Sequence, residues 1–265
     1  MQGTHRSTLL HSWAIQRRVI GALLIRESLT RYGRHNIGFL WLFVEPMIFT
    51  LFIVALWTMM RGSHGSNLPI AAFAITGYSS VLLWRNMSGR AIGGLGPNKT
   101  LMYHRNVRAI DVFIARLSIE LLGATMSFAV LSILFTFIGM MDLPEDILKV
   151  LFGWFMLAWF GTALAIFLGA LSERSEAVEK IWGPVSYILF PLSGAAFLVD
   201  AMPTQFQDFL LLFPMVHGLE LMREGYFGSA IHAHYDMGYM TIFNAVLTLL
   251  GLANTRIISK TATPR

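Results

Sequence analysis

The sequence predicts an all-α integral membrane protein with six transmembrane helices, and three observations support this fold class. Hydrophobic residues make up 55% of the 265 residues and charged residues only 13%, whereas soluble domains carry about a quarter charged residues. Six apolar segments are long enough to cross the roughly 30 Å hydrocarbon core of a bilayer. Lys and Arg gather in the loops and tails that would lie on one side of that bilayer.

A moderately apolar leader, residues 9–30, comes before the first span and is expected to form a helix on the membrane surface. One face of that helix carries the apolar side chains of Leu9, Trp13, Ile20 and Leu24. An amphipathic helix of this kind lies in the plane of the headgroups, with tryptophan at headgroup depth and arginines on lipid phosphates. Membrane lipids are therefore expected partners of this segment.

Six apolar segments follow, each close to the roughly twenty residues that a transmembrane helix requires. They cover residues 37–60, 68–84, 112–140, 147–171, 181–199 and 237–258. A further apolar run at 206–213 is a weaker candidate, because Asp208 interrupts it and Pro214 closes it.

The placement of Lys and Arg sets the orientation of these segments. They crowd the leader, the loop between the second and third spans, the loop between the fourth and fifth, and the tail; the exceptions are Arg61, Lys149 and Arg223. The positive-inside rule places those four regions, and hence both termini, in the cytoplasm. Because both termini lie on one side, the number of crossings is even, and the region 200–235 enters from the outer face and returns to it.

The region 200–235 is the most unusual part of the chain, because it is apolar in places and still fails to become a span. Pro203 and Pro214 interrupt it, and it continues as Pro214-x-x-His217-x-x-Glu220-x-x-Arg223, with polar groups at helical spacing. Non-helical backbone at membrane depth survives only where protein or a water-filled cavity covers it. We expect a re-entrant element whose polar residues either face the transported molecule or brace neighbouring helices.

Two carboxylates fall inside predicted spans, where a charged group is costly and by default indicates function. Glu45 is followed by Pro46 in the first span, and proline in a helix frees a backbone carbonyl and bends the helix. This pair predicts either a hinge with a polar group facing a cavity or a structural ion pair with an arginine of a neighbouring helix. Glu120 lies four residues after Arg116, a spacing that favours an intrahelical ion pair.

The loop 85–111 is the longest cytoplasmic loop and is rich in basic residues. Its residues 93–100 nearly match a phosphate-binding P-loop, but Asn98 stands where the final glycine is needed, and the segment follows a membrane span. The P-loop requires a strand–loop–helix context, so the chain is expected to have no ATPase site and to be no enzyme by itself. A short basic loop of this kind is better suited to docking on a cytoplasmic partner.

Catalytic, cofactor and metal sites are not expected from the sequence. The chain has no cysteine, and His232 and His234, which flank Ala233, do not belong to a larger set of carboxylate or cysteine ligands in the sequence, which makes them a weak signal for a metal. Ser193 lies in no nucleophile-elbow pattern. No nucleic-acid partner is expected either.

Three motifs, taken together, resemble ABC-2 type polysaccharide exporters, and most closely the capsule-export permeases of the KpsM type. They are Ile37-Gly38-Phe39-Leu40-Trp41 with Glu45-Pro46; His104-Arg105-Asn106-Val107 with Ile110-Asp111, Ala115-Arg116 and Glu120; and Pro191-Leu192-Ser193-Gly194 with Pro203 and Pro214-x-x-His217-x-x-Glu220-x-x-Arg223-Glu224-Gly225. The resemblance covers essentially the whole chain, and the last motif is the most specific of the three.

The resemblance implies a single transmembrane domain, 1–265, of the ABC-2 (type V exporter) fold, which forms a homodimer with two copies of a separate ATP-binding cassette subunit. ATP and Mg would bind in that subunit. It further implies a coupling helix in the loop 85–111, periplasmic gate helices within 200–235, and location in a bacterial inner membrane. The exported molecule would be a lipid-linked anionic capsular polysaccharide, passed to a periplasmic co-polymerase and an outer-membrane export channel.

Roles for individual residues follow as hypotheses from the residues and the resemblance together. Three arginines would gather the anionic lipid end of the polymer at the cytoplasmic mouth: Arg26, Arg31 and Arg34. The translocation path would include Trp41, Glu45, Pro46 and Tyr78, since aromatic rings can stack on sugars. Coupling to the ATPase would involve Arg90, Lys99, His104 and Arg105. The periplasmic gate would use Pro214, His217, Glu220 and Arg223.

Several other functions stay open from the sequence. An ABC-2 permease could instead carry O-antigen, teichoic acid or a small hydrophobic molecule. An ion-coupled secondary transporter would use Glu45 as its ion site, would need no ATPase, and would be expected to show an inverted repeat, which is not evident. A membrane-embedded acyl- or glycosyltransferase lacks any supporting set of catalytic residues.

Overall fold

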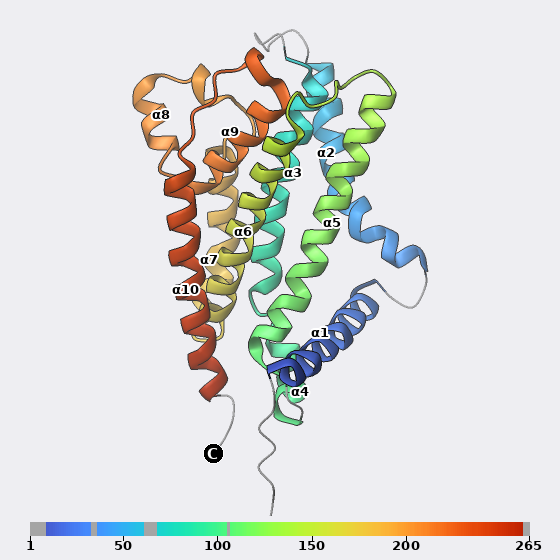
Figure 1. Cartoon of the computed structure of the whole chain (residues 1–265), viewed down its shortest axis with the longest axis vertical. Coiled ribbons are helices and arrows are strands. Elements are labelled where there is room, and N and C mark those ends of the chain that lie inside the picture. The colour runs from blue at the N-terminus through green and yellow to red at the C-terminus, as the bar shows by residue number, and fades with distance from the viewer. Residues whose placement is uncertain (1–8, 33–35, 61–67, 105–106, 262–265) are drawn as a thin grey trace, which may run out of the picture.

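The chain folds into a bundle of long helices with shorter helices at both ends. The computed structural model describes residues 9–32, 36–60, 68–104 and 107–261. The helices that run along the long axis are α2 (Asn36–Met59), α3 (Ile70–Ala91), α5 (Ala109–Phe137), α6 (Ile147–Ser172), α7 (Glu176–Leu192) and α10 (Met237–Thr261) (Figure 1). The described residues are helical apart from turns and connecting segments, so the predicted all-α fold is confirmed for them.

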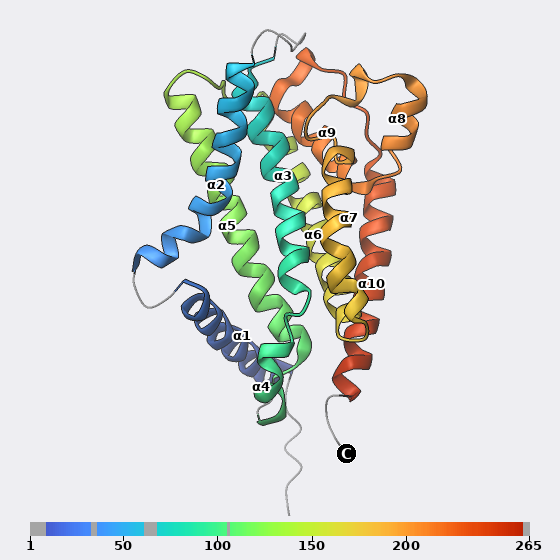
Figure 2. The ribbon, with the colours of Figure 1, turned by 180° about the vertical axis from the view of Figure 1, so that it is seen from behind.

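The short helices divide between the two ends of the bundle. One end, called the α1 end, holds α1 (Leu9–Tyr32), the 3-10 helix η1 (Gly96–Asn98), α4 (Lys99–His104) and the end of α10 (Figure 1). The opposite α9 end holds η2 (Val199–Ala201), α8 (Thr204–Leu210), α9 (Pro214–Phe227) and η3 (Gly228–Ala230). Figure 2 shows that α3 lies between α2 and α7 on one side of the molecule.

Within the described residues, four helices are long and apolar enough to cross a membrane. They are Leu40–Met59, Ala109–Phe137, Ile147–Ser172 and Met237–Ser259, and they correspond to the predicted first, third, fourth and sixth spans. The other two predicted spans correspond to α3, which is 22 residues long, and α7, which is 17 residues long and contains two prolines. Both lie within the bundle beside the four apolar helices (Figures 1 and 2).

Helix α3 is less apolar than the other long helices because it is the central helix of the bundle. Nearly all of its residues from Ala71 to Trp84 are buried. Three of its hydroxyl groups bond to carbonyls of the same helix: Thr76 Oγ1 donates to Ala72 O (2.8 Å), Ser80 Oγ donates to Thr76 O (2.6 Å) and Ser88 Oγ donates to Trp84 O (2.9 Å). These hydrogen bonds reduce the free-energy cost of burying small polar side chains. A hydropathy scale counts such side chains as polar, so it makes α3 look less buried than it is.

The boundaries of the fifth predicted span, 181–199, differ from those of α7. The helix begins five residues earlier and ends at Leu192, where the chain turns through Gly194 at a φ of 79°. Only glycine adopts this left-handed backbone conformation without steric cost. The apolar residues that follow therefore belong to a packed turn and to η2 rather than to the helix.

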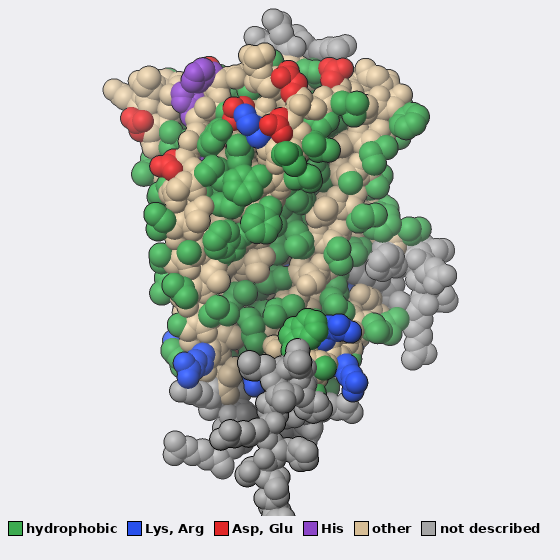
Figure 3. Space-filling view, in the orientation of Figure 1, with side chains coloured by type: hydrophobic (Ala, Val, Ile, Leu, Met, Phe, Trp, Pro, Cys, Tyr) green, Lys and Arg blue, Asp and Glu red, His purple; other side chains and the backbone are tan. Residues whose placement is uncertain are grey.

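The outer surface of the bundle is apolar between its two ends. Large hydrophobic side chains are exposed along α5, α6 and α10, among them Leu122, Phe155 and Leu249. In Figure 3 the charged side chains of this face gather at the two ends, and the band between them is free of Lys, Arg, Asp and Glu. Such an apolar belt is typical of a surface that faces lipid.

Helices α6 and α9 approach each other closely through glycines. A Cβ atom on Gly153 would lie 2.8 Å from the carbonyl oxygen of Gly218, and one on Gly218 would lie 2.8 Å from Leu157 Cγ. Real side chains do not fit at these distances, so glycine at both positions permits the contact. This contact seats α9 against the bundle.

Candidate functional site

The predicted leader helix packs on α5 through a row of polar contacts. Three pairs join the two helices: Gln16 Nε2 donates to Asp111 Oδ1 (2.9 Å), Arg116 Nε donates to Glu27 Oε1 (2.7 Å), and Arg31 donates to Glu120. Leu23 is buried between them, whereas Trp13 is exposed. A helix is present where it was predicted and ends two residues later, and its position on the membrane surface stays a prediction.

Four charged side chains meet where α1, α2, α3 and α5 come together, and we call Arg31, Glu45, Arg90 and Glu120 the charge cluster. Arg31 and Arg90 both contact Glu120, the latter with Nε 3.3 Å from Oε1. The same two arginines lie 3.9 and 4.0 Å from the carboxylate oxygens of Glu45. Exposure of the side chains rises from 7% for Glu120 and 19% for Arg31 to 45% for Arg90 and 50% for Glu45.

The expected intrahelical pair between Arg116 and Glu120 is wrong. Arg116 instead donates to Glu27 and to the backbone carbonyl of Arg90 (3.2 Å). Glu120 forms ion pairs with Arg31 and Arg90 instead. Tertiary contacts that bury a carboxylate are stronger than an exposed i,i+4 pair, which contributes only about 0.3–0.5 kcal/mol, and they decide the pairing.

Of the two roles considered for Glu45 and Pro46, the structure shows the ion pair with arginines of neighbouring helices. Glu45 makes the ion pairs just described and is still half exposed. Pro46 lies inside α2, which changes direction along its length in Figures 1 and 2. The proline cannot donate a hydrogen bond to the carbonyl of Leu42. Gly123 of α5 packs there, where a Cβ would lie 2.9 Å from that carbonyl oxygen.

The predicted coupling region forms a turn, η1 and α4, not the strand–loop–helix of a P-loop. Arg26 of α1 donates to Asn98 Oδ1 (2.6 Å), and Asn98 in turn donates to Gly94 O (3.1 Å). Lys99 Nζ lies 3.2 Å from Glu173 Oε2 at the end of α6. Contacts to α1 and α6 therefore hold this region. Arg34, Arg105 and the side chain of His104 lie outside the described residues.

Aromatic side chains gather where α2, α3 and α7 meet. Tyr78 is buried and lies with its ring centroid 5.5 Å from Phe190, 5.8 Å from Trp57 and 6.1 Å from Phe49. Trp41 lies on the same helix as Glu45 and is 54% exposed. The structure thus places Trp41 and Glu45 at the surface of α2, and Tyr78 inside.

Sequence reasoning missed a second polar group on this side of the bundle. The guanidinium of Arg85 lies 4.5 Å above the ring of Tyr187, and its Nε lies 3.4 Å from Ser186 Oγ. Tyr187 itself is largely exposed on α7. The sequence shows only that Arg85 directly follows the second apolar segment. Its partners Ser186 and Tyr187 lie about a hundred residues away, so the sequence does not reveal the contact.

At the α9 end, Arg223 is completely buried and holds the turn that follows α7. Its guanidinium donates to three backbone carbonyls: Gly194 O (2.7 Å), Ala195 O (2.7 Å) and Phe197 O (2.8 Å). It also lies 3.9 Å above the ring of Phe73. Arg223 therefore braces this turn against α3 and α9.

His217 and Glu220 hold the segment between η3 and α10. His217 Nε2 donates to Leu211 O (2.8 Å), and its Nδ1 accepts from the backbone N–H of Asp236 (2.8 Å). These partners require the neutral ring with its proton on Nε2, and burial lowers the pKa of His217. Glu220 Oε2 accepts from the backbone N–H of His234 (3.2 Å), and burial raises the pKa of this carboxyl.

The four predicted gate residues are thus brought together on α9. Pro214 occupies the first turn of the helix, where its missing N–H costs nothing. His217, Glu220 and Arg223 are each at most 3% exposed. The polar residues were expected either to face the transported molecule or to brace neighbouring helices. Their contacts in this conformation are of the second kind and join α9 to the turn after α7 and to the segment before α10.

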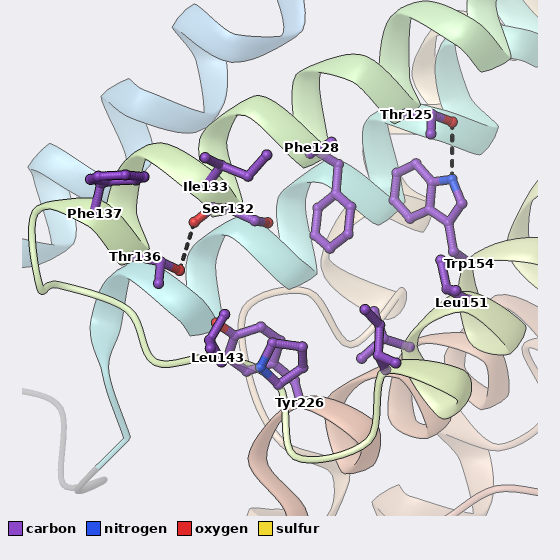
Figure 4. A pocket seen from close by; sticks show the side chains of 14 residues that line it. Thr125, Phe128, Ser132, Ile133, Thr136, Phe137, Leu143, Leu151, Trp154 and Tyr226 are labelled. Atoms are coloured by element: carbon purple, nitrogen blue, oxygen red, sulfur yellow. Dashed lines mark hydrogen bonds between the residues drawn. The ribbon is translucent and has the colours of Figure 1, made fainter.

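A cavity of about 410 Å³ lies between α5 and the start of α6. Figure 4 shows its lining, with the rings of Phe128 and Trp154 on one side and Tyr226 and Leu143 on another. Thr125 accepts from Trp154 Nε1 (3.1 Å), as the dashed line in Figure 4 shows. The lining is almost entirely apolar, so this cavity does not suit a charged or sugar ligand.

Comparison with known proteins places the chain in a family. Residues 18–227 match the model of the ABC-2 type transporter family. The chain is 44% identical over its full length to the full-length capsule polysaccharide export inner-membrane protein CtrC of Neisseria meningitidis serogroup B. It is 42% identical, again over both full lengths, to the capsule polysaccharide export inner-membrane protein BexB of Haemophilus influenzae.

A more distant relative extends the comparison. The polysialic acid transport protein KpsM of Escherichia coli is 24% identical over 90% of this chain and 93% of its own length. The family match spans most of the chain, from α1 to the end of α9, and the chain therefore belongs to the ABC-2 type transporter family.

Proposed function

We propose that the chain is the transmembrane subunit of an ATP-driven ABC transporter that exports lipid-linked capsular polysaccharide across the bacterial inner membrane. The observation that carries the proposal is the 44% identity to a capsule polysaccharide export protein over the whole of both chains. ATP and Mg would bind to a separate ATP-binding cassette subunit, and this chain would perform no hydrolysis itself.

We propose six crossings with both termini in the cytoplasm. The four apolar helices would be joined by α3 and α7, which lie beside them in the bundle (Figure 2). Basic side chains gather at the α1 end and acidic ones predominate at the α9 end (Figure 3). The positive-inside rule therefore favours a cytoplasmic α1 end and a periplasmic α9 end, with α8 and α9 entering from the periplasm and returning to it.

The translocation path would run along the face formed by α2, α3 and α7. Exposed polar groups occur there, namely Glu45 and Arg90 of the charge cluster and Tyr187 beside Arg85. Charged groups at membrane depth face a water-filled cavity or a protein partner rather than lipid. The outer sides of α5, α6 and α10 carry exposed leucine, isoleucine and phenylalanine instead, as expected for contact with lipid.

A second copy of the chain would close this path from the other side. Exposed rings such as Trp41 and Tyr187 would then line the conduit, where their flat faces stack on sugar rings without fixed hydrogen bonds. Arg26, Arg31 and Arg34 would attract the anionic lipid-linked end of the polymer at the cytoplasmic mouth, because phosphate and carboxylate groups form charge-assisted hydrogen bonds with guanidinium.

Coupling to the ATPase would pass through η1 and α4 to the charge cluster. Asn98 of η1 holds Arg26 of α1, and Arg90 near the end of α3 contacts both Glu45 of α2 and Glu120 of α5. A shift of the loop between α3 and α5 would therefore move α1 and the bent part of α2 together. At the other end, the brace on α9 would set the position of the periplasmic gate, from which a co-polymerase and an outer-membrane channel would receive the polymer.

The geometry of Glu45 disfavours the ion-coupled secondary transporter. Two guanidinium groups lie within 4.0 Å of its carboxylate. These positive charges repel a cation that approaches the same carboxylate, and a transporter that uses Glu45 as its ion site would have to bind one there.

The proposal is tested by capsule assembly in a strain that lacks this chain. The double variant Arg31→Ala/Arg34→Ala should abolish surface capsule while the dimer and its ATPase partner still co-purify. The double variant Arg17→Ala/Arg18→Ala controls for the loss of positive charge on the same helix, where both arginines are exposed. Because Arg31 also pairs with Glu120, Glu120→Gln is the second control: it breaks that ion pair and keeps the arginines, and it should retain capsule. If capsule export is unchanged in the first variant, the role of the arginines is wrong; if deleting the chain leaves the capsule intact, the proposed function is wrong.

A further inference from the structure

Three potential metal ligands meet at the α9 end, although they come from separate segments. Asp200 belongs to η2, and His232 and His234 belong to the segment between η3 and α10. Their ligand atoms all lie within 4.8 Å of one another. His234 Nε2 is 2.9 Å from Asp200 Oδ1, and the two imidazole rings have centroids 5.1 Å apart. Asp200 brings a carboxylate to the two histidines from a segment that lies more than thirty residues earlier in the sequence.

Hydrogen bonds to α9 hold the segment that carries the two histidines. The segment leaves η3 through Ile231, which has extended backbone angles (φ −131°, ψ 153°), and both imidazole rings face Asp200. The N–H of His234 is bonded to Glu220 and that of Asp236 to His217, so α9 fixes the segment. The ligands are therefore presented by backbone that is already ordered.

Two imidazole nitrogens and one carboxylate oxygen suit a transition-metal ion of intermediate hardness, such as zinc. Zinc binds imidazole nitrogen and carboxylate oxygen at about 2.0–2.2 Å, with tetrahedral geometry, so its ligand atoms lie about 3.3 Å apart. The pair of Asp200 and His234 is already close to that spacing. The exposed ring of His232 would reach the same point by a side-chain rotation, and water would complete the fourth position. Hard cations such as Mg²⁺ prefer oxygen-only sites.

We propose that Asp200, His232 and His234 form a binding site for a divalent transition metal, with zinc as the best-matched ion. The bound ion would join η2, ahead of α8, to the segment that leads into α10. A cavity of about 550 Å³, lined in part by His234, Tyr235 and Asp236, gives the ion an approach from solvent. The proposal does not depend on the transported molecule, and it is tested on the purified protein.

The experiment measures zinc binding to the full-length chain in detergent, purified with an affinity tag that contains no histidine and stripped with a chelator. Calorimetric titration should give about one zinc ion per chain. Removing a partner that only supports a ligand weakens metal binding ~10–100-fold, so loss of a direct ligand in His232→Ala or Asp200→Asn should weaken it at least ~10-fold. Asp142→Asn, at another exposed acidic residue of the same end, should bind zinc as the unaltered chain does.

A second measurement distinguishes a tetrahedral metal site from an ordinary ion pair at the surface. Titration with Co²⁺ should give the intense visible absorption bands of tetrahedral coordination in the unaltered chain, and these bands should be lost in both variants. Both altered side chains are exposed, and matched elution from size exclusion establishes that the variants are folded. The proposal is overturned if the unaltered chain binds no stoichiometric zinc, if Co²⁺ gives no such bands, or if the folded variants bind zinc as tightly as the unaltered chain.

Discussion

Replacing Glu120 with glutamine should destabilise the chain more than any exposed charge substitution. The substitution keeps the shape of the side chain and removes only its charge, so packing in α5 is unchanged. Arg31 and Arg90 then face a neutral amide in place of the carboxylate that they share. The loss tests whether the charge cluster holds α1 and α3 on α5.

The magnitude follows from the burial of each partner. Breaking a fully buried ion pair costs about 3–5 kcal/mol, and Glu120 is only 7% exposed. Arg31 is 19% exposed and keeps Glu45 within 3.9 Å, which reduces the loss. Arg90 is 45% exposed, so its share is that of a surface pair, at most about 1 kcal/mol. We expect a total loss of about 2–3 kcal/mol in the free energy of unfolding.

Thermal unfolding of the purified protein in a single detergent measures the effect. The matched control is Glu176→Gln, which removes an i,i+4 pair whose side chains are 78% and 90% exposed and which should cost less than about 0.5 kcal/mol. A double-mutant cycle with Arg31→Met should show a coupling energy above about 1 kcal/mol. If Glu120→Gln is no more destabilising than Glu176→Gln, the charge cluster does not hold these helices together.

The brace on α9 and the packing of α3 give three further predictions. Arg223→Met removes the guanidinium that donates to three backbone carbonyls, two of them on buried residues, and should lower the free energy of unfolding by about 3 kcal/mol, measured by thermal unfolding. Burial lowers the pKa of His217 in the folded chain, so as the pH falls this histidine is protonated more readily in the unfolded chain. The free energy of unfolding should therefore be at its full value above about pH 6.5 and decrease as the pH is lowered from there. In His217→Gln the free energy of unfolding should depend less steeply on pH. Gly77→Ala should destabilise the fold, since its Cβ would lie 2.5 Å from Ala195 O. In Gly21→Ala, by contrast, the Cβ meets nothing within 4 Å, and the variant should be neutral or up to about 1 kcal/mol more stable.

Each of these predictions has a result that contradicts it. An Arg223→Met chain as stable as the unaltered one would mean that the turn after α7 does not depend on the guanidinium. Equal pH slopes in the two proteins would assign the pH dependence to another group than His217. Equal stability of Gly77→Ala and Gly21→Ala would show that α3 is not packed against the turn as the structure has it.

The helical architecture could be predicted from the sequence because lipid imposes a simple rule on length and hydropathy. The spans at 147–171 and 237–258 agree with α6 and α10 to within a few residues. The predicted fifth span, 181–199, begins and ends several residues later than α7, because hydropathy continues past Leu192 while the backbone turns at Gly194. Hydropathy reports burial, and a packed turn beneath α9 is as buried as a helix.

The candidate site could be predicted as a set of residues, but its pairings could not. Sequence patterns point to Glu45, Arg31 and Arg90 one by one, but their contacts with Glu120 join four helices that are distant in the sequence. The sequence gives no sign that Asp200 is near the histidines, because it lies more than thirty residues from His234. Local spacing predicts neighbours on one helix, and it carries no information about which helices touch.

The central claim is that this chain works with a separate ATPase to move polysaccharide through the membrane. The most direct measurement reconstitutes the chain and its ATP-binding cassette partner in liposomes, and follows the accumulation of lipid-linked capsular polysaccharide in the lumen. The proposed function predicts accumulation that requires both proteins and hydrolysable ATP. Transport by the chain alone, driven by an ion gradient and indifferent to ATP, would contradict it.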